Sequence, residues 1–160
     1  FDDIFYKELN RAKRDKTILC LLSLDVDYFK FYNDTYGHQE GDIVLQTISK
    51  ILMLNLKRPS DFSFRMGGEE FSAIFTMSED KEIYEFSEYI RKSIEDTKIK
   101  HKKNSVSQFI TVSIGVVFVD FSKNHEMNIL KKDLYKYSDE LLYKAKASGR
   151  NKVFIEEWIE

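Results

Sequence analysis

The sequence predicts an α+β fold in which helices pack on a single mixed sheet. Apolar strand-like runs alternate with segments of helical period, and two of these runs flank the Gly67-Gly68 pair. No linker rich in proline, glycine or serine divides the 160 residues. Because Gly-Gly between strands indicates a hairpin, we expect a ferredoxin-like βαββαβ core, with a mixed, mainly antiparallel sheet and flanking helices.

Apolar residues at helical spacing predict the helices, at Phe1–Arg14, Phe29–Tyr36, Asp42–Leu56, Asp80–Thr97 and Leu130–Ala147. Apolar or alternating runs predict the strands, at Thr17–Val26, Phe62–Met66, Glu70–Phe75, Phe109–Phe121 and Lys152–Ile155. The first strand is apolar throughout, which is typical of a strand buried on both faces. The polar and basic stretch Lys100–Ser107 predicts a solvated loop.

The composition excludes several classes of protein. Lys and Arg total 25 against 27 Asp and Glu, so we expect no nucleic-acid partner. The longest apolar stretch, Ile18–Leu24, is too short to cross a bilayer, and the one cysteine forms no internal disulfide. We expect residues 1–160 to form one cytoplasmic domain without membrane contact. The start at Phe1 suggests a piece of a longer signalling protein, with a sensory or regulatory domain upstream.

Two acidic positions follow the first predicted strand. A carboxylate at the end of an apolar run, as at Asp25, is costly unless a partner compensates its charge, and such strand ends often bind ligands. Asp27 is open to a second interpretation, as the cap of the next helix.

The second acidic pair follows the Gly-Gly turn. Strand alternation sends Glu69 and Glu70 to opposite faces, and alone the pair could be an exposed hairpin tip. If the first strand lies beside this hairpin, Asp25 and Glu69 converge. Two carboxylates about 5 Å apart repel by roughly 3 kcal/mol at an effective dielectric of 20. A divalent cation relieves that repulsion, and oxygen ligands suit Mg²⁺ or Mn²⁺, with a phosphate-bearing substrate.

Four ordered motifs resemble the GGDEF-domain family, the diguanylate cyclases. The first motif comprises residues 25–30, Asn33, Asp34 and residues 36–42. The other three are the hairpin Arg65–Phe71, the strand Ser113–Val116 and the helix end Ser138–Asn151, and together the four span nearly the whole chain. The family's usual opening D-x-L-T-x-L-x-N-R segment is absent. The resemblance implies a fold similar to nucleotidyl cyclases and polymerase palms. It also implies that two GTP condense to cyclic di-GMP and two pyrophosphates across a homodimer.

The resemblance assigns roles to individual residues. It implies that Asp25, the Val26 carbonyl and Glu69 bind the metal, that Glu69 accepts a proton, and that Glu70 is a required acid. Asn33 and Asp42 match the guanine-reading pair, and His38 lines the same pocket or ends a helix. Residues expected at the phosphates are Phe29, Lys30, Lys146 and Arg150; the last two could instead complement a helix dipole.

Arg58 and Asp61 stand at the family's spacing for an R-x-x-D site at which cyclic di-GMP inhibits the enzyme. An arginine fork can grip guanine or phosphate. The same pattern also arises in surface turns with a local Arg–Asp pair. Arg91, on the following helix, is a weaker candidate for a second cation there.

Two other functions remain open at this point. Some GGDEF domains have lost catalysis and bind cyclic di-GMP only through R-x-x-D, and others make mixed adenine–guanine products. The residues Asp25, Asn33, Asp42, Glu69, Lys146 and Arg150 are all present, which favours the enzyme, and Asp42 favours GTP.

Overall fold

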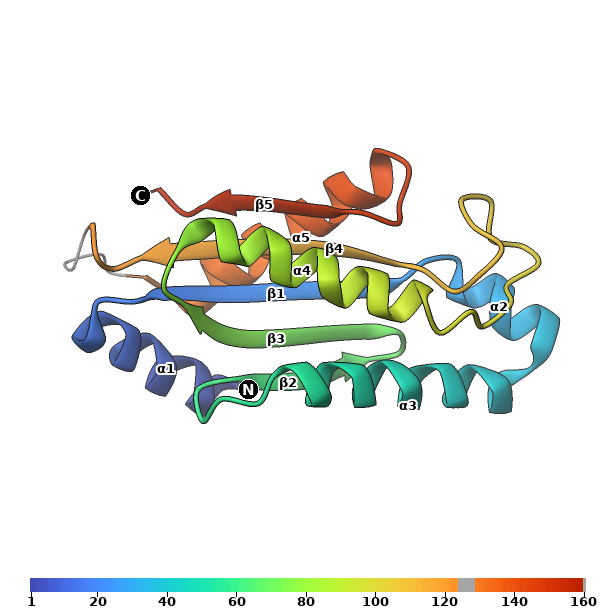
Figure 1. Ribbon diagram of the computed structural model, residues 1–160, viewed down its shortest axis with the longest axis horizontal. Coiled ribbons are helices and arrows are strands. Elements are labelled where there is room, and N and C mark those ends of the chain that lie inside the picture. Colours follow the sequence, from blue (N-terminus) through green and yellow to red (C-terminus); the bar gives the residue numbers. More distant parts are fainter. Residues whose placement is uncertain (124–128, 160) are drawn as a thin grey trace.

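The computed structural model describes residues 1–123 and 129–159, and it contains one sheet flanked by helices (Figure 1). The strands are β1 (Ile18–Val26), β2 (Phe62–Gly67), β3 (Glu70–Met77), β4 (Val112–Asp120) and β5 (Val153–Glu157). The helices are α1 (Asp2–Asp15), α2 (Phe29–Tyr36), α3 (His38–Asn55), α4 (Asp80–Glu95) and α5 (Lys131–Ala147). The predicted α+β class is confirmed.

The strand order in the sheet is β2-β3-β1-β4-β5. The pairs β1–β3, β1–β4 and β2–β3 are antiparallel, whereas β4 and β5 are parallel. The central strand β1 is buried along its whole length, as its continuous apolar run predicts. The chain therefore places the exit of β1 between two neighbouring strands.

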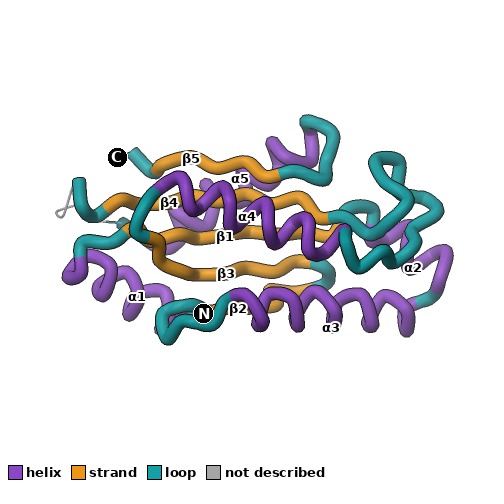
Figure 2. Tube along the Cα trace, viewed as in Figure 1, coloured by secondary structure: helices purple, strands orange, loops and turns teal. Residues whose placement is uncertain are grey.

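Helices cover both faces of the sheet (Figure 2). On one face α2, α3 and α4 pack over one set of alternating β1 side chains, including Leu22 and Leu24. On the other face α1 and α5 pack over Leu19 and Leu21. Because side chains alternate along a strand, Asp25 lies on the face that α5 covers.

Two predicted boundaries differ from the structure by three residues or more. Helix α3 begins at His38 rather than Asp42, because Gly37 at φ 90° breaks the chain between α2 and α3 and leaves residues 38–41 free to continue as helix. Strand β4 begins at Val112, since Phe109 forms only an isolated bridge with Lys100.

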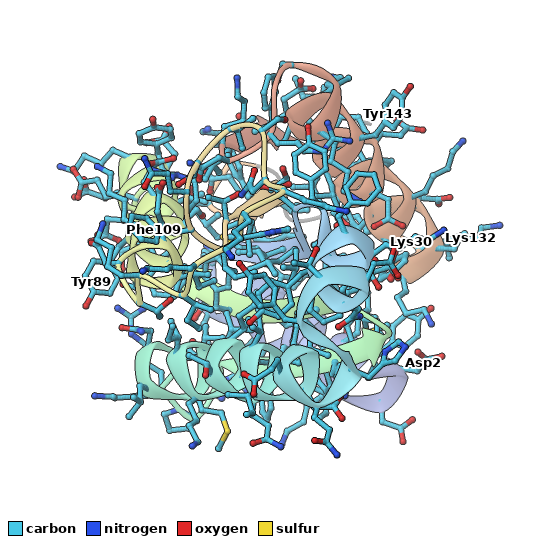
Figure 3. The ribbon with its side chains drawn as sticks, turned by 90° about the vertical axis from the view of Figure 1, so that its right-hand side faces the viewer. Asp2, Lys30, Tyr89, Phe109, Lys132 and Tyr143 are labelled. Atoms are coloured by element: carbon cyan, nitrogen blue, oxygen red, sulfur yellow. The ribbon has the colours of Figure 1, made fainter. Side chains whose placement is uncertain are left out.

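Four segments that carry predicted site residues meet at one end of the sheet, on the right of Figure 1. They are the end of β1, the β2–β3 turn, the start of α2 and the end of α5. Figure 3 views the molecule from this end. Within the described ranges, none of the helices combines the length and apolar character needed to cross a bilayer.

Candidate active site

Asp25 is the buried carboxylate of this site. It lies at the end of β1 with 7% of its surface exposed, and its Oδ1 is 2.9 Å from the Nζ of Lys146 on α5. Burial raises the pKa of Asp25 to about 6, although Lys146 acts in the opposite direction. The negative charges of Glu69 and Glu70 contribute to this raised pKa. One ammonium group therefore compensates only part of the negative charge gathered at this strand end.

The Gly-Gly hairpin brings its acids to Asp25. In the register of β1 and β3, Glu70 stands opposite Asp25, and Glu69 occupies the turn just before it. The pairing of β2 with β3 shifts between Arg65 and Gly67, which marks a bulge at the turn. The Gly68 carbonyl accepts two hydrogen bonds from the Arg65 guanidinium, at 3.0 Å from Nε and 2.8 Å from Nη2. Arg65 thus clamps the residue that precedes Glu69.

Asp27 is not the cap of the next helix, so that interpretation is wrong. Helix α2 has no side-chain cap, and Asp27 is 1% exposed. Its carboxylate accepts hydrogen bonds from the hydroxyls of Thr111 at 2.8 Å and Ser113 at 2.7 Å, and from the Asn151 backbone at 3.0 Å. These three donors replace water for the buried charge, and they tie β1 to β4 and to the turn after α5.

The first turn of α2 carries two of the four residues expected at the phosphates. Phe29 is buried in the core and anchors the helix, whereas Lys30 is exposed. The amides at a helix start have no partner within the helix, and they favour an anion. Tyr28, which precedes them, adopts a left-handed backbone with φ 55°.

The Asn33 side chain on α2 packs directly against Gly41 on α3. A Cβ on Gly41 would lie 1.9 Å from the Asn33 Oδ1, so only glycine leaves room for this amide. The Oδ1 is buried and has no hydrogen-bond partner among the described residues. Asp42 follows on α3, exposed beside a groove of about 530 Å³ that Arg65 also lines.

Comparison with known proteins identifies the family of this chain. The family model "Diguanylate cyclase, GGDEF domain" matches residues 1–152. The chain belongs to the GGDEF domain family. Its Gly-Gly-Glu-Glu-Phe hairpin, at residues 67–71, is the turn between β2 and β3.

Relatives of this GGDEF domain include known cyclases. Diguanylate cyclase DosC of Escherichia coli K12 is 38% identical over 150 residues, which are 94% of this chain and 31% of that protein. This chain spans about a third of the length of the curated relatives it matches.

Solved GGDEF structures share the fold. An active GGEEF domain of a diguanylate cyclase from Vibrio cholerae superposes with a TM-score of 0.79 at 30% identity, covering 96% of this chain and 92% of that one. The GGDEF domain of DgcB from Caulobacter crescentus, solved in complex with c-di-GMP, also gives 0.79 at 30% identity, with 97% and 87% covered.

The two basic residues near the end of α5, Lys146 and Arg150, have different partners. Lys146 contacts Asp25, as described above. Arg150 follows the helix and stacks over the Tyr28 ring, with its guanidinium carbon 4.5 Å from the ring centroid. His38 is exposed at the first position of α3. Roles of these residues in binding GTP stay predictions.

The residues predicted for an inhibitory site form a local turn. Asp61 accepts a hydrogen bond at 3.0 Å from the backbone amide of Arg58, and the Arg58 guanidinium donates to the Thr76 carbonyl at 2.9 Å. Burial raises the pKa of Asp61, and its Oδ1 has no partner in the described part of the chain. The pair therefore combines a structured turn with an unused buried oxygen.

Arg91 is engaged elsewhere. Its guanidinium donates to Glu88 at 3.0 Å, to Glu95 at 3.1 Å and to the Asn151 Oδ1 at 2.6 Å. It is 8% exposed, so these bonds fix it inside the α4–β5 side of the molecule. This geometry favours a structural role for Arg91.

The donor set at the β1 exit fits a hard divalent cation. It offers the carboxylates of Asp25 and Glu69 beside the Val26 backbone, all oxygen ligands of the kind that Mg²⁺ prefers. Burial and, to a smaller extent, the charges of Glu69 and Glu70 raise the pKa of Asp25, and a bound cation would favour its charged form. No cluster of three or more His, Cys, Asp or Glu side chains suited to a metal occurs in residues 1–123 and 129–159. The ion would therefore keep positions open for phosphate oxygens.

Sequence reasoning missed His101. Within a stretch predicted to be solvated, its side chain is completely buried, and its Nε2 lies 3.1 Å from the Tyr28 carbonyl. A lone histidine among lysines gives no signal of burial, because its partner is a backbone group 73 positions earlier.

Proposed function

We propose that this GGDEF domain is a diguanylate cyclase that condenses two GTP into cyclic di-GMP with release of two pyrophosphates. The observation that carries the proposal is the arrangement at the β1 exit, where buried Asp25 faces the Gly-Gly-Glu-Glu turn on β3. The family membership and the DosC-like relatives support the same activity.

The chemistry is two equivalent displacements. The 3′-hydroxyl oxygen of one GTP bonds to the α-phosphorus of the other, the α–β phosphoanhydride bond breaks, and pyrophosphate leaves with the electron pair. Glu69 would accept the hydroxyl proton, as general base. Asp25, the Val26 carbonyl and Glu69 would hold a divalent ion, which would neutralise charge on the phosphates. Glu70 supports this site from the register position opposite Asp25.

The nucleotide would extend from the phosphates to the guanine groove. Asn33 and Asp42 read guanine, since an aspartate accepts from its N1–H and amino group while an amide both accepts and donates. His38 begins the helix that carries Asp42. Phe29 and Lys30 bring backbone amides to the phosphates.

Lys146 has two partners in this account. In the free domain its ammonium neutralises Asp25 at 2.9 Å. When the nucleotide binds, the same ammonium would turn to its phosphates, beside Arg150. The 31% exposure of the Lys146 side chain leaves it room to move.

Each protomer binds one GTP, so turnover needs a homodimer in which two sites face each other. Product would return to the Arg58–Asp61 turn as an inhibitor. The Arg58 side chain is exposed, and the guanidinium nitrogens other than Nη1, which bonds to the Thr76 carbonyl, would donate to guanine.

The test is product identification. Incubation with GTP and Mg²⁺, followed by chromatography and mass spectrometry, should yield cyclic di-GMP and two pyrophosphates per product. ATP should not compete, because the N1 of adenine carries no hydrogen that it could donate to Asp42. Recovery of unchanged GTP would contradict the proposal.

The alternative is a silent receptor for cyclic di-GMP, which the structured Arg58–Asp61 turn favours. Calorimetry separates the two. A receptor would bind cyclic di-GMP but not GTP with Mg²⁺, and Arg58→Ala would then abolish all nucleotide binding. The cyclase should keep its GTP binding in that variant.

A further inference from the structure

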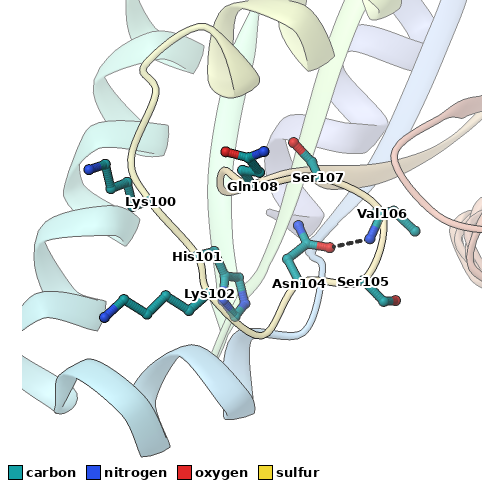
Figure 4. A pocket seen from close by; sticks show the side chains of 8 residues that line it. All are labelled: Lys100, His101, Lys102, Asn104, Ser105, Val106, Ser107 and Gln108. Carbon is teal, nitrogen blue, oxygen red and sulfur yellow. Dashed lines mark hydrogen bonds between the residues drawn. The ribbon is translucent and has the colours of Figure 1, made fainter.

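The loop between α4 and β4, residues 100–108, packs against the start of α2 and surrounds a groove of about 540 Å³ (Figure 4). Its lysines are exposed, but it also contacts two tyrosines that precede or belong to α2. The Lys102 amide donates to the Tyr36 hydroxyl at 3.1 Å. The Ser105 hydroxyl donates to the Tyr28 hydroxyl at 2.8 Å. The loop is therefore attached to the helix on which substrate binding is proposed.

Tyr28 occupies an unfavourable backbone region. Its φ of 55° and ψ of 30° are left-handed, which disfavours a residue with a Cβ by roughly 1–2 kcal/mol. Such a conformation persists only where surrounding contacts impose it. Because Tyr28 immediately precedes Phe29 and Lys30, its backbone sets the direction of their amides.

His101 holds the carbonyl of this strained residue. Its Nε2 lies 3.1 Å from the Tyr28 oxygen, which also accepts the Tyr32 amide of the first helical turn. Burial lowers the pKa of His101, which favours the neutral ring with its one N–H hydrogen. The carbonyl accepts only from an N–H, so that hydrogen is on Nε2. Tyr32 packs edge-on against the ring, at 5.3 Å between centroids.

The side chain of Tyr28 is held as firmly as its carbonyl. The Arg150 guanidinium stacks over the Tyr28 ring and donates to its hydroxyl at 3.3 Å. The same hydroxyl accepts from Ser105 at 2.8 Å. One tyrosine thus links the loop, the start of α2 and an arginine proposed to bind phosphates.

We propose that His101 and Ser105 are positioning residues for the nucleotide phosphates. They touch no substrate, but through Tyr28 they fix the first amides of α2 and the guanidinium of Arg150. This inference rests on the proposed function, because it concerns the phosphate end of the same GTP. The loop would therefore affect the affinity for the triphosphate without contacting it.

Two serines of the loop give a matched test. Ser105 donates to Tyr28, whereas Ser107 donates to Glu95 on α4 at 3.0 Å. Calorimetry uses Mg²⁺ and the α,β-methylene analogue of GTP, which cannot be cleaved. Ser105→Ala should weaken binding about threefold to tenfold, the effect of one lost hydrogen bond. Ser107→Ala should bind like the wild type.

His101 supplies a second test. In His101→Gln the amide nitrogen can still donate to Tyr28, so binding should stay within about twofold of the wild type. His101→Leu should lose roughly tenfold or more, since the carbonyl loses its donor. In steady-state assays the KM for GTP should rise in His101→Leu and Ser105→Ala while kcat stays nearly constant, a separation that general destabilisation would not give.

Equal affinities of Ser105→Ala and Ser107→Ala would overturn the inference, as would failure of His101→Gln to rescue His101→Leu. If the wild type binds no analogue, the proposed function itself fails, and the positioning role fails with it. If the wild type binds and the serine variants are equal, only the positioning role fails.

Discussion

Ionised Asp25 should lower the free energy of unfolding of the free domain, and this effect can be measured as a function of pH. Its pKa is raised from 3.8 to about 6 in the folded chain, so the folded state binds more protons than the unfolded state between these pH values. Stability therefore falls as pH rises through this window, and the loss is complete above pH 6. The shift corresponds to about 3 kcal/mol at most.

Asp25→Asn should accordingly stabilise the metal-free domain at pH 7.5, by about 1–3 kcal/mol, because the buried charge is gone. Lys146 is partly exposed and can turn to water. Thermal unfolding at pH 7.5 and pH 4 measures the effect, and the difference should vanish at the lower pH. Asp42→Asn, an exposed control, should change little. A destabilised Asp25→Asn at pH 7.5 would contradict the account.

At Gly41, substitution by alanine should lower GTP affinity without destabilising the helix. Alanine favours a helix interior over glycine by roughly 1 kcal/mol, so Gly41→Ala does not harm α3 as a helix. Its Cβ would instead lie 1.9 Å from the Asn33 Oδ1 and displace that amide. GTP affinity, measured by calorimetry, should fall on the order of tenfold.

A double-mutant cycle gives the control. Once Asn33→Ala has removed the amide, adding Gly41→Ala should cause no further loss of GTP affinity. Additive losses in the double variant would show that Gly41 acts by some route other than Asn33.

At the scale of elements, Gly115 fixes how closely α5 approaches β4. A Cβ at this position would lie 2.2 Å from the Leu142 nitrogen and 2.3 Å from the Ser138 oxygen, both backbone atoms that cannot turn aside. Gly115→Ala should therefore lower the free energy of unfolding in urea by about 3 kcal/mol or more. It should also displace Lys146, which α5 carries.

Gly68→Ala is the matched control, because nothing lies within 4 Å of its added carbon. Its φ of 50° still disfavours a side chain, so a loss of only about 1–2 kcal/mol is expected. Equal losses in the two variants would mean that α5 does not rest on Gly115 as described.

The sequence predicts these elements unequally well. The uninterrupted apolar run of β1 and the Gly-Gly turn are local signals, and both are found where predicted. The start of α3 was missed because residues 38–41 are polar and show no apolar period, although they are helical. Asp27 looked like a cap because its three donors come from residues 84 to 124 positions away.

For the site, sequence patterns identify the residue types but not their partners. The register that sets Glu70 opposite Asp25 depends on strand order, which no local pattern contains. The contact of Lys146 with Asp25 and the burial of His101 likewise arise from segments far apart in the chain.

At the scale of the whole molecule, the proposed reaction requires two domains. Each GTP supplies one attacking hydroxyl and one α-phosphate, so half of the reaction sits on each protomer. Below the dissociation constant of the dimer, the initial rate should rise with about the square of protein concentration. Sedimentation run alongside gives the oligomeric state. Constant activity per mole of a chain that sediments as a monomer would contradict the facing arrangement.

The most direct test of the central claim, that Asp25 and Glu69 hold the reacting phosphates through one cation, is turnover by Glu69→Gln. The substitution keeps the size of the side chain but removes both the charge and the base. Cyclic di-GMP formation, measured by chromatography, should fall at least about a hundredfold, with a melting temperature near that of the wild type. Product formation at the wild-type rate would contradict the account.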